Sequence, residues 1–574
     1  MKHLLKQLKA YRKESILGPL FKLLEAGFEL LVPLLVAAMI DQGVKLGDKS
    51  VIVRMSLMMV GLGLIGLLCS VTAQYFAAKA AVGSTTRLRR ALFAHLQTLS
   101  YTELDTIGAS TMLTRLTSDM NQVQSGVNLT LRLALRSPFV VFGAMVMAFT
   151  IDVHAAAVFA IVIPILFAVV FGVMIVCIPL YRKVQARLDR VLGMTRENLT
   201  GVRVLRAFGR EEEQKREFSA RNDALTKEQN HVGRISVLLN PVTYVIINLA
   251  IVALIRTGAL RVESGALSQG DVIALYNYMS QILVELIKLA NLVLNITRAV
   301  ACCNRIGAVL EIESSQHSPQ TEPETTADAP AIEFRRAGLR YAGAGGDALD
   351  GISFRAEKGQ TIGVIGGTGS GKTTLINLIP RFYDATEGSV LVDGVPVEQY
   401  PLESLRRRIG VVPQKAVLFH GTIRENLLWG DPDADDGTLR EALRAAQAEE
   451  IVQGKEGGLD FEIEQGGRNL SGGQRQRLTI ARALVRKPEI LILDDSASAL
   501  DFATDAALRK ALRALPERPT VVIVSQRTSS IRHADQIIVL DNGHMVGLGT
   551  HEELLRTCEV YREIHESQYK KEER

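Results

Sequence analysis

The strongest chemical signal in this sequence is a run of residues that fits the pattern G-x-x-x-x-G-K-S/T. Its members are Gly366, Gly367, Thr368, Gly369, Ser370, Gly371, Lys372 and Thr373. An apolar run, 361–365, precedes it, and a second apolar run begins with Thr374. This strand–loop–helix context is what a phosphate-binding loop requires. A plain glycine turn is the simpler alternative, and the complete match to the pattern disfavours it.

The residue types explain how such a loop would hold a nucleotide. Glycines let the backbone curl so that its N–H groups face the phosphates. The helix that begins behind the loop adds the positive end of its dipole. Lys372 is expected to reach the β- and γ-phosphates, while Thr373 is expected to hold Mg²⁺. We therefore predict ATP and Mg²⁺ as the cofactors, with Thr374 also in the ATP site.

Other stretches fit the same chemistry. The apolar strand 490–494 ends in Asp494, a carboxylate suited to hold Mg²⁺ beside the loop. Gln414 is a candidate contact to Mg²⁺ or to the attacking water, and Tyr341 is a candidate stacking partner for adenine. A glycine turn that opens a helix offers free N–H groups to a phosphate. It consists of Leu470, Ser471, Gly472, Gly473 and Gln474.

The rest of the chain must position these residues, and its composition divides it in two. The 574 residues are too many for one soluble domain. Apolar tracts fill the first 300 or so residues, and a mixed charged sequence follows. The expected domains are a membrane domain at 1–310, a Ser/Thr/Pro/Glu-rich linker at 311–330 and a nucleotide-binding α/β domain at 331–574. The net charge of +5 gives no nucleic-acid signal, and the five cysteines show no metal or disulfide spacing.

Six apolar stretches are each close to the roughly 20 residues that a bilayer requires. They lie near 16–40, 53–78, 127–150, 155–180, 237–262 and 272–297, after a basic amphipathic segment at 2–13. Two of the connections, 79–124 and 181–234, are long, helical in pattern and rich in arginine. The positive-inside rule places them in the cytoplasm, together with the N-terminus and the ATPase domain. Each long arm is expected to turn over at a short segment, near 100–107 and near 208–215.

Charged and amide side chains inside the predicted spans have two interpretations. Interhelical pairing or snorkelling is the simpler one, and contact with a transported substrate is the other. The residues concerned are Glu25, Glu29, Arg132, Arg136, Arg256, Glu285, Lys288, Asn291 and Asn295.

The motifs together resemble one family. The phosphate loop, Gln414, the LSGGQ turn at 470–474, the strand ending in Asp494 and the SALD sequence ending in Asp501 occur in the order of an ABC transporter ATPase. With six preceding spans, nearly the whole chain resembles a half-transporter of the ABC exporter type. The resemblance implies an α-helical transmembrane domain followed by an α/β P-loop ATPase domain, in the cell membrane.

This resemblance also implies a partner. Two such chains associate head to tail, and each ATP lies between the phosphate loop of one chain and the LSGGQ turn of the other. Asp501 corresponds to a loop that crosses the dimer. The segments 100–107 and 208–215 correspond to the coupling helices, which transmit motion to the spans.

Two residues depart from the family pattern. Asp495 stands where active members have glutamate, and its side chain is shorter by one C–C bond, about 1.5 Å. Gln526 stands where the family has a histidine that contacts the γ-phosphate; glutamine cannot carry the imidazolium charge. Both changes affect one catalytic site, which is the pattern of a degenerate subunit in a heterodimeric multidrug-type exporter. We therefore expect a different partner chain with intact glutamate and histidine.

Several alternatives remain open at this stage. A homodimeric exporter could hydrolyse ATP slowly with aspartate and glutamine, and an ATP-gated channel or sensor could use ATP binding without pumping. The six spans exclude a soluble P-loop enzyme, and the fused domains disfavour an importer. The cargo is expected to be a small molecule, a lipid or a peptide.

Overall fold

The computed structural model describes residues 1–326 and 328–569, so position 327 of the predicted linker and positions 570–574 of the predicted ATPase domain lie outside the described residues. The chain forms two compact units. The first comprises Met1–Gln97 and Ser110–Ile312, and the second comprises Thr98–Ala109 and Glu313–Arg574. The short segment Thr98–Ala109 therefore belongs with the nucleotide-binding residues, although membrane helices precede and follow it.

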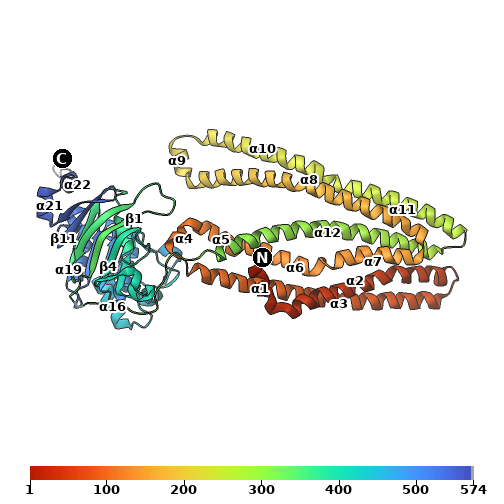
Figure 1. The fold of residues 1–574 in the computed structure, drawn as a ribbon, viewed down its shortest axis with the longest axis horizontal. Helices are drawn as coiled ribbons and strands as arrows, with labels where there is room; N and C mark the ends of the chain where they lie inside the picture. Colours follow the sequence, from red (N-terminus) through yellow and green to blue (C-terminus); the bar gives the residue numbers. More distant parts are fainter. Residues whose placement is uncertain (327, 570–574) are drawn as a thin grey trace. The chain divides into compact units, whose positions relative to one another are not determined.

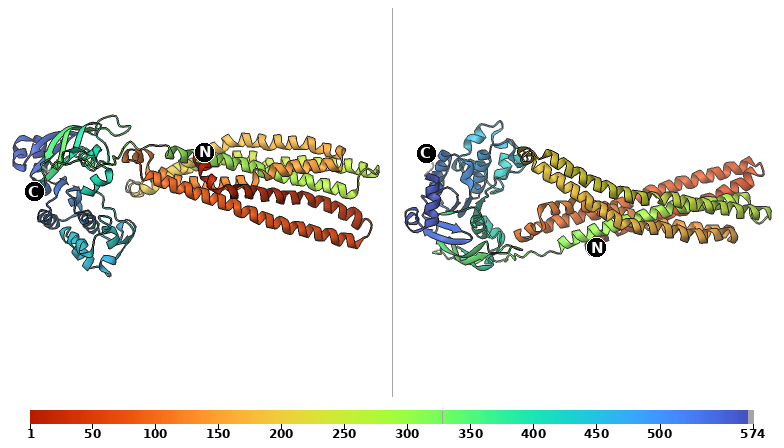
Figure 2. Two further views of the ribbon diagram at one scale, coloured as in Figure 1. Left: turned by 60° about the horizontal axis from the view of Figure 1, so that its bottom comes forward. Right: turned by 90° about the horizontal axis from the view of Figure 1, so that it is seen from above.

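The first unit is entirely helical over its described residues (Figures 1 and 2). Its α-helices are α1 (Lys2–Leu8), α2 (Arg12–Ala38), α3 (Lys49–Leu96), α5 (Ala109–Thr114), α6 (Met120–Leu133), α7 (Arg136–Ile151), α8 (Val153–Thr200), α9 (Val202–Ala207), α10 (Glu211–Val237), α11 (Leu239–Glu263) and α12 (Gln269–Leu310). Six helical stretches are long and apolar enough to cross a membrane, which confirms the predicted spans. The third predicted span contains a short break between α6 and α7.

The long arms are single helices that continue directly from the spans. Both α3 and α8 run for 48 residues, so at 1.5 Å per residue each is about 70 Å long and exceeds a bilayer core. The return helix α10 packs along α8, and the two run side by side in both figures. Most of α10 is exposed, and only Leu225 and Val232 among its residues are buried.

The position predicted for the second turn of the arms is wrong by several residues. The short helix there is α9, Val202–Ala207, and the predicted segment 208–215 instead contains a bend and the start of α10. Gly209, with φ of +60°, allows the bend. Glu211, Glu212 and Glu213 occupy the first turn of α10, where acidic side chains interact favourably with the helix dipole.

Most of the intramembrane charges pair with one another. Arg136 of α7 bridges Glu29 of α2, at 2.6 Å, and Glu285 of α12, at 2.5 Å. Lys288 lies 2.7 Å from the same Glu285. Lys22 pairs with Glu25 within α2. Glu29, Arg136 and Glu285 therefore pair between helices, as the simpler of the two interpretations predicts.

The second unit is an α/β domain with two main sheets. The larger has the strand order β12-β11-β3-β10-β9-β6, parallel except for β12, and the smaller is antiparallel with the order β2-β1-β4-β5. The strands are β1 (Ile332–Leu339), β2 (Leu349–Ala356), β3 (Thr361–Gly366), β4 (Glu387–Val392), β5 (Val395–Pro396), β6 (Ile409–Val412), β7 (Gly421–Thr422), β8 (Glu462–Ile463), β9 (Ile490–Asp494), β10 (Thr520–Val524), β11 (Gln536–Asp541) and β12 (His544–Gly549).

The helices of this unit surround the sheets. They are α4 (Tyr101–Ile107), α13 (Lys372–Leu378), α14 (Leu402–Arg408), α15 (Ile423–Leu427), α16 (Asp436–Ala445), α17 (Glu449–Gln453), α18 (Gly472–Val485), α19 (Phe502–Arg513), α20 (Thr528–Ile531), α21 (His551–Thr557) and α22 (Glu559–Tyr569). The strand β9, between β10 and the edge strand β6, is buried on both faces: Leu491 and Leu493 contribute to one core, and Ile490 and Ile492 contribute to the other. Such two-sided burial explains why β9 reads as a continuous apolar run.

The helix α4 packs against residues of the second unit. The ring of Tyr101 lies 4.8 Å from that of Phe382, between centroids. The hydroxyl of Tyr383 donates a 2.5 Å hydrogen bond to Asp105. Burial, as the larger cause, and this bond hold the pKa of Tyr383 above its usual value. A short segment from the middle of the membrane half is therefore fixed on the ATPase half by aromatic packing and a hydrogen bond.

Candidate nucleotide site

The phosphate loop joins β3 to α13. Gly369 and Gly371 have φ of +83° and +98°, a backbone conformation that side chains other than glycine rarely adopt. A Cβ on Gly371 would lie 2.8 Å from the carbonyl oxygen of Ala348, so the loop has no space for a larger residue there. The ammonium of Lys372 donates hydrogen bonds to the carbonyls of Gly366, at 3.0 Å, and Gly367, at 2.6 Å. The lysine is thereby held over the curled loop.

The charges around Lys372 suit an anionic ligand. Burial lowers the pKa of its ammonium, and the carboxylates of Asp495 and Asp494 offset part of this effect. Bound phosphate would favour the charged form of the lysine still further.

The predicted Mg²⁺ ligands lie together. Thr373 lies in the first turn of α13, Asp494 ends β9, and the Thr373 hydroxyl donates a 3.3 Å hydrogen bond to the Asp494 carboxylate. Burial raises the pKa of Asp494, and the adjacent charge of Asp495 raises it further. The Thr373 hydroxyl and the Asp494 carboxylate are hard oxygen ligands of the kind that Mg²⁺ prefers, so these two residues fit the ion, while the third predicted ligand, Gln414, lies beside Asp495. When bound, the ion would neutralise charge on the phosphates.

Asp495 and Gln526 come from neighbouring strands. In the parallel register, Asp494 of β9 is opposite Val524 of β10, and the Asp495 amide donates a 3.0 Å hydrogen bond to the Val524 carbonyl. The side-chain amide of Gln414 lies 3.5 Å from the Asp495 carboxylate, the outer limit of a hydrogen bond. Gln526 is exposed two residues beyond Val524. Both departures from the family pattern therefore lie at the same edge of the sheet as Asp494.

Tyr341 lies beside the phosphate loop. Its hydroxyl donates a 3.1 Å hydrogen bond to Thr374, and both residues line a cavity of about 480 Å³ together with Gly369, Lys372 and Thr373. Four other lining residues were not predicted from the sequence: Asp347, Ala348, Asn542 and Gly543. Asp347 forms a two-pronged ion pair with Arg340, at 2.8 and 2.9 Å, which fixes the loop after β1 at the cavity.

The LSGGQ turn forms the start of α18. The Ser471 hydroxyl accepts a hydrogen bond from the Gln474 amide, while the Gln474 side chain accepts one from the Ser471 amide, so the turn is a capping box. Leu470 is buried, and Gly472 is exposed. Gly473 lies close to Ala499, shortly before Asp501, which caps α19 through the Thr504 amide.

The signature turn and the phosphate loop remain separate within one chain. Among the described residues, no hydrogen bond or ion pair links 470–474 to 366–374. The exposed first turn of α18 carries N–H groups that can bind a phosphate.

Comparison with known proteins gives two family matches. Residues 15–286 match the family model of the ABC transporter transmembrane region, and residues 349–498 match the family model described as ABC transporter.

Relatives resemble the chain over its whole length. An uncharacterized ABC transporter ATP-binding protein of Mycobacterium tuberculosis is 38% identical over 98% of this chain and 97% of its own. The uncharacterized ABC transporter ATP-binding protein YfiB of Bacillus subtilis is 36% identical over 100% of this chain and 99% of its own. An ATP-dependent lipid A-core flippase of Chromobacterium violaceum is 30% identical over 99% of this chain and 97% of its own. The solved structure of a bacterial Atm1-family ABC exporter with ATP bound has the same fold, with a TM-score of 0.80, 23% identity and coverage of 97% and 98%.

Proposed function

This chain belongs to the ABC transporter family as an exporter half-transporter, and we propose that it exports a small molecule, lipid or peptide as one subunit of a heterodimer. ATP hydrolysis by its cytoplasmic ATPase domain drives the transport. One of its relatives is named as a lipid A-core flippase, which supports a lipid as one of the cargo classes.

The pairing of Asp495 with Gln526 carries the heterodimer proposal. Both lie at the ends of adjacent strands, where the γ-phosphate of an ATP held by Lys372 would be expected. A general base needs a heavy-atom distance of roughly 2.6–3.2 Å to its water, and the shorter aspartate should fall outside it. The phosphate loop and the LSGGQ turn are complete. The chain therefore binds ATP at its own slow site and completes a competent site on its partner.

Exposed apolar surfaces on both units support a dimer. Around the tip of the second arm, Leu199, Val204 and Phe208 are 73%, 59% and 76% exposed. On the ATPase unit, Phe419 stacks on Trp429 with ring centroids 4.4 Å apart, and these residues are 45% and 60% exposed. Apolar surfaces of this kind mark interaction sites. We assign the arm tip of each chain to the aromatic pair of the other.

Steady-state ATPase of the purified complex tests the asymmetry. In this chain, Asp495→Asn should leave most of the activity, because its own site contributes little. Gly472→Asp should lower the activity roughly 100-fold or more, about 2.7 kcal/mol of barrier, because the LSGGQ turn positions the partner's ATP. Within its own chain a Cβ on Gly472 has no neighbour within 4 Å, so the variant should fold.

A matched control introduces the same charge elsewhere. Gly437→Asp lies in the exposed first turn of α16, and it should leave the ATPase rate unchanged. If Asp495→Asn proves as damaging as Gly472→Asp, the two sites are equivalent and the homodimeric exporter replaces the heterodimer. Nucleotide-dependent conductance without uphill transport would instead support the channel or sensor.

A cysteine pair tests the partner directly. Val204→Cys and Trp429→Cys in the same chain should cross-link two copies if the exporter is a homodimer, because each arm tip then meets the aromatic pair of an identical chain. In the heterodimer we expect no disulfide between two copies of this chain, and only a cysteine placed in the partner chain should cross-link to the Val204→Cys variant. Electrophoresis without reducing agent, with each single variant as control, distinguishes the two results.

A further inference from the structure

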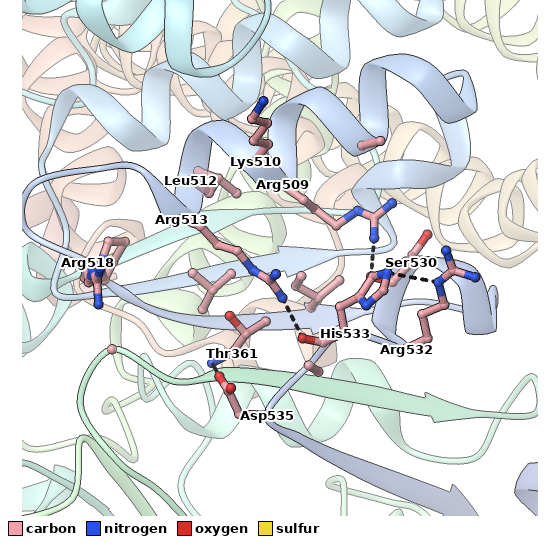
Figure 3. Close-up of a pocket in the computed structure, with 16 residues that line it drawn as sticks. Thr361, Arg509, Lys510, Leu512, Arg513, Arg518, Ser530, Arg532, His533 and Asp535 are labelled. Carbon is pink, nitrogen blue, oxygen red and sulfur yellow. Dashed lines mark hydrogen bonds between the residues drawn. The ribbon is translucent and has the colours of Figure 1, made fainter. Parts of the chain in front are cut away.

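The ATPase unit has a second large pocket, which Figure 3 shows with the residues that line it. It has a volume of about 680 Å³ and reaches Thr361, the first residue of β3, and Pro519, the residue before β10. The phosphate loop follows the carboxyl end of β3, so the two sites lie at opposite ends of the same strand. The nucleotide chemistry of the phosphate loop makes no use of this pocket.

The pocket is strongly basic. Its lining includes Arg509, Lys510 and Arg513 of α19, together with Arg518 and Arg532. The one carboxylate among the described lining residues is Asp535, which accepts a 2.7 Å hydrogen bond from the Thr361 amide. A second carboxylate, Asp505, pairs with Arg509 at 3.1 Å just outside the lining. Together the two carboxylates leave an excess of positive charge in the pocket.

The backbone holds two of the arginines in place. Arg513 donates a 2.5 Å hydrogen bond to the carbonyl of His533, and Arg509 donates a 3.3 Å bond to the carbonyl of Ser529. Arg532 donates a 3.0 Å hydrogen bond to the ring of His533, which is seen in Figure 3 between these arginines. Burial and the charges of Arg532, Arg509 and Arg513 lower the pKa of His533. Cations gathered so closely repel one another, and a bound anion would relieve that repulsion.

We propose that this pocket binds a small polyanion of the phosphate-chain class, such as a nucleoside polyphosphate or an inorganic polyphosphate, in addition to the ATP at the phosphate loop. Arginine guanidinium groups match phosphate oxygens with paired donors, and the volume falls in the range of ordinary ligand sites. One wall of the pocket comes from α19, and α19 begins just after Asp501. Another wall comes from the segment that follows α20, and α20 begins two residues beyond Gln526. A bound anion therefore joins two elements that each start beside a residue of the nucleotide site.

Inorganic tripolyphosphate is the probe, with binding to the purified full-length chain measured by titration calorimetry in the absence of Mg²⁺. Lys372→Ala removes the main cation of the phosphate loop, so binding that survives in this variant reports the basic pocket. Adding Lys510→Gln and Arg532→Gln should weaken that remaining binding about 10-fold or more. Among the described contacts, neither side chain bonds to the main chain, so the fold should persist. The matched control, Arg407→Gln with Arg556→Gln, neutralises two exposed cations elsewhere in the unit and should leave the affinity unchanged.

Each remaining outcome overturns the proposal. Loss of all tripolyphosphate binding in Lys372→Ala alone would assign the anion to the phosphate loop. Equal losses in the pocket pair and the control pair would indicate non-specific charge attraction. Binding of polyglutamate without binding of tripolyphosphate would assign the pocket to an acidic peptide. Photo-labelling with an ATP analogue, in the pocket pair with Lys372 intact, reports separately on the proposed nucleotide site.

Discussion

At the scale of single residues, the two consecutive carboxylates at the end of β9 serve different neighbours. Asp494 faces Thr373, whereas Asp495 has a left-handed backbone, with φ of +44°, and its side chain reaches toward Gln414. Few residues tolerate this conformation, and aspartate is among those that adopt it more readily. Burial raises the pKa of Asp495, which makes it a stronger base than an exposed aspartate, but the length of its side chain still limits its reach.

Asp495→Glu should therefore restore hydrolysis at the chain's own site. The measurement uses a complex whose partner site is silenced by Gly472→Asp in this chain, so that the residual ATPase reports the site of Asp495. A displacement of the base by about 1 Å can change the rate roughly 100-fold, so we expect an increase of about 10- to 100-fold. Asp495→Asn in the same background is the control and should give no increase. An unchanged rate with glutamate would show that side-chain length does not limit this site.

The sequence predicted a glycine loop between a strand and a helix at 366–373 and a glycine turn opening a helix at 470–474, and the structure has both, because their spacing is local and glycine-dependent; their binding of ATP stays a prediction. No comparable signal marks Asp347, Asn542 and Gly543 at the nucleotide cavity. These residues approach the loop only through the pairing of β11 with β3 and through the Arg340 ion pair. The Asn542–Gly543 pair reads in sequence simply as a turn between β11 and β12, so its second role depends on tertiary structure.

At the scale of elements, the last helix, α22, is tied to the segment that carries Gln526. The side-chain amide of Gln568 donates a 2.7 Å hydrogen bond to the Gln526 carbonyl. Its oxygen accepts hydrogen bonds of 2.9 Å from both the amide and the hydroxyl of Thr528. One side chain thus fastens the main chain on both sides of Arg527.

Gln568→Ala should loosen this segment without unfolding the domain. The Gln568 side chain makes three hydrogen bonds. At about 0.5–1 kcal/mol each, their loss of about 1.5–3 kcal/mol corresponds to a roughly 10- to 160-fold change in local opening. Amide hydrogen exchange at 525–528 should accelerate by that factor. Ser567→Ala is the matched control, since the Ser567 hydroxyl bonds only to Ile564 of its own helix among the described contacts. Equal rates of amide hydrogen exchange at 525–528 in the two variants would show that the Gln568 side chain does not hold this segment.

Element boundaries show which predictions depend on local physics. The six spans were predictable because the bilayer sets a minimum apolar length. The prediction for the short helix at the second turn was several residues off. Its position depends on the bends at Gly201 and Gly209 together with the acidic first turn of α10. The packing site of α4 was not predictable, because Tyr101 and Phe382 are far apart in the sequence and come together only in the folded structure.

At the scale of the whole molecule, the chain is a multi-pass membrane protein with a cytoplasmic ATPase domain. Its short helix connections and its long arms should therefore face opposite sides of the membrane. All five cysteines are buried, so a chain with an introduced cysteine offers a clean labelling background.

Lys49→Cys and Ser264→Cys should react with an impermeant thiol reagent from outside intact cells, whereas Arg210→Cys should react only after permeabilisation. Lys49 and Ser264 are exposed, and they avoid the nearby Gly47 and Gly265, whose φ values of +69° and +74° disfavour a side chain. Labelling by mass shift of the purified chain gives the readout. The reverse pattern would overturn the orientation.

The packing of α4 against the ATPase half affects the order in which the protein can fold during synthesis. Asp105 and its hydrogen-bond partner Tyr383 are 278 positions apart, so the ribosome must add most of the membrane half and the first strands of the ATPase half between them. Translation adds about 5–20 residues per second, so about 14–56 s pass between the synthesis of α4 and that of Tyr383, and Tyr101 has no packing partner during this time. The membrane half cannot finish maturing by itself, because one of its connections is completed only when the nucleotide-binding half has emerged. Truncated chains that stop before Tyr383 should therefore be recognised by the cell's quality control as unfinished, even with all six spans inserted.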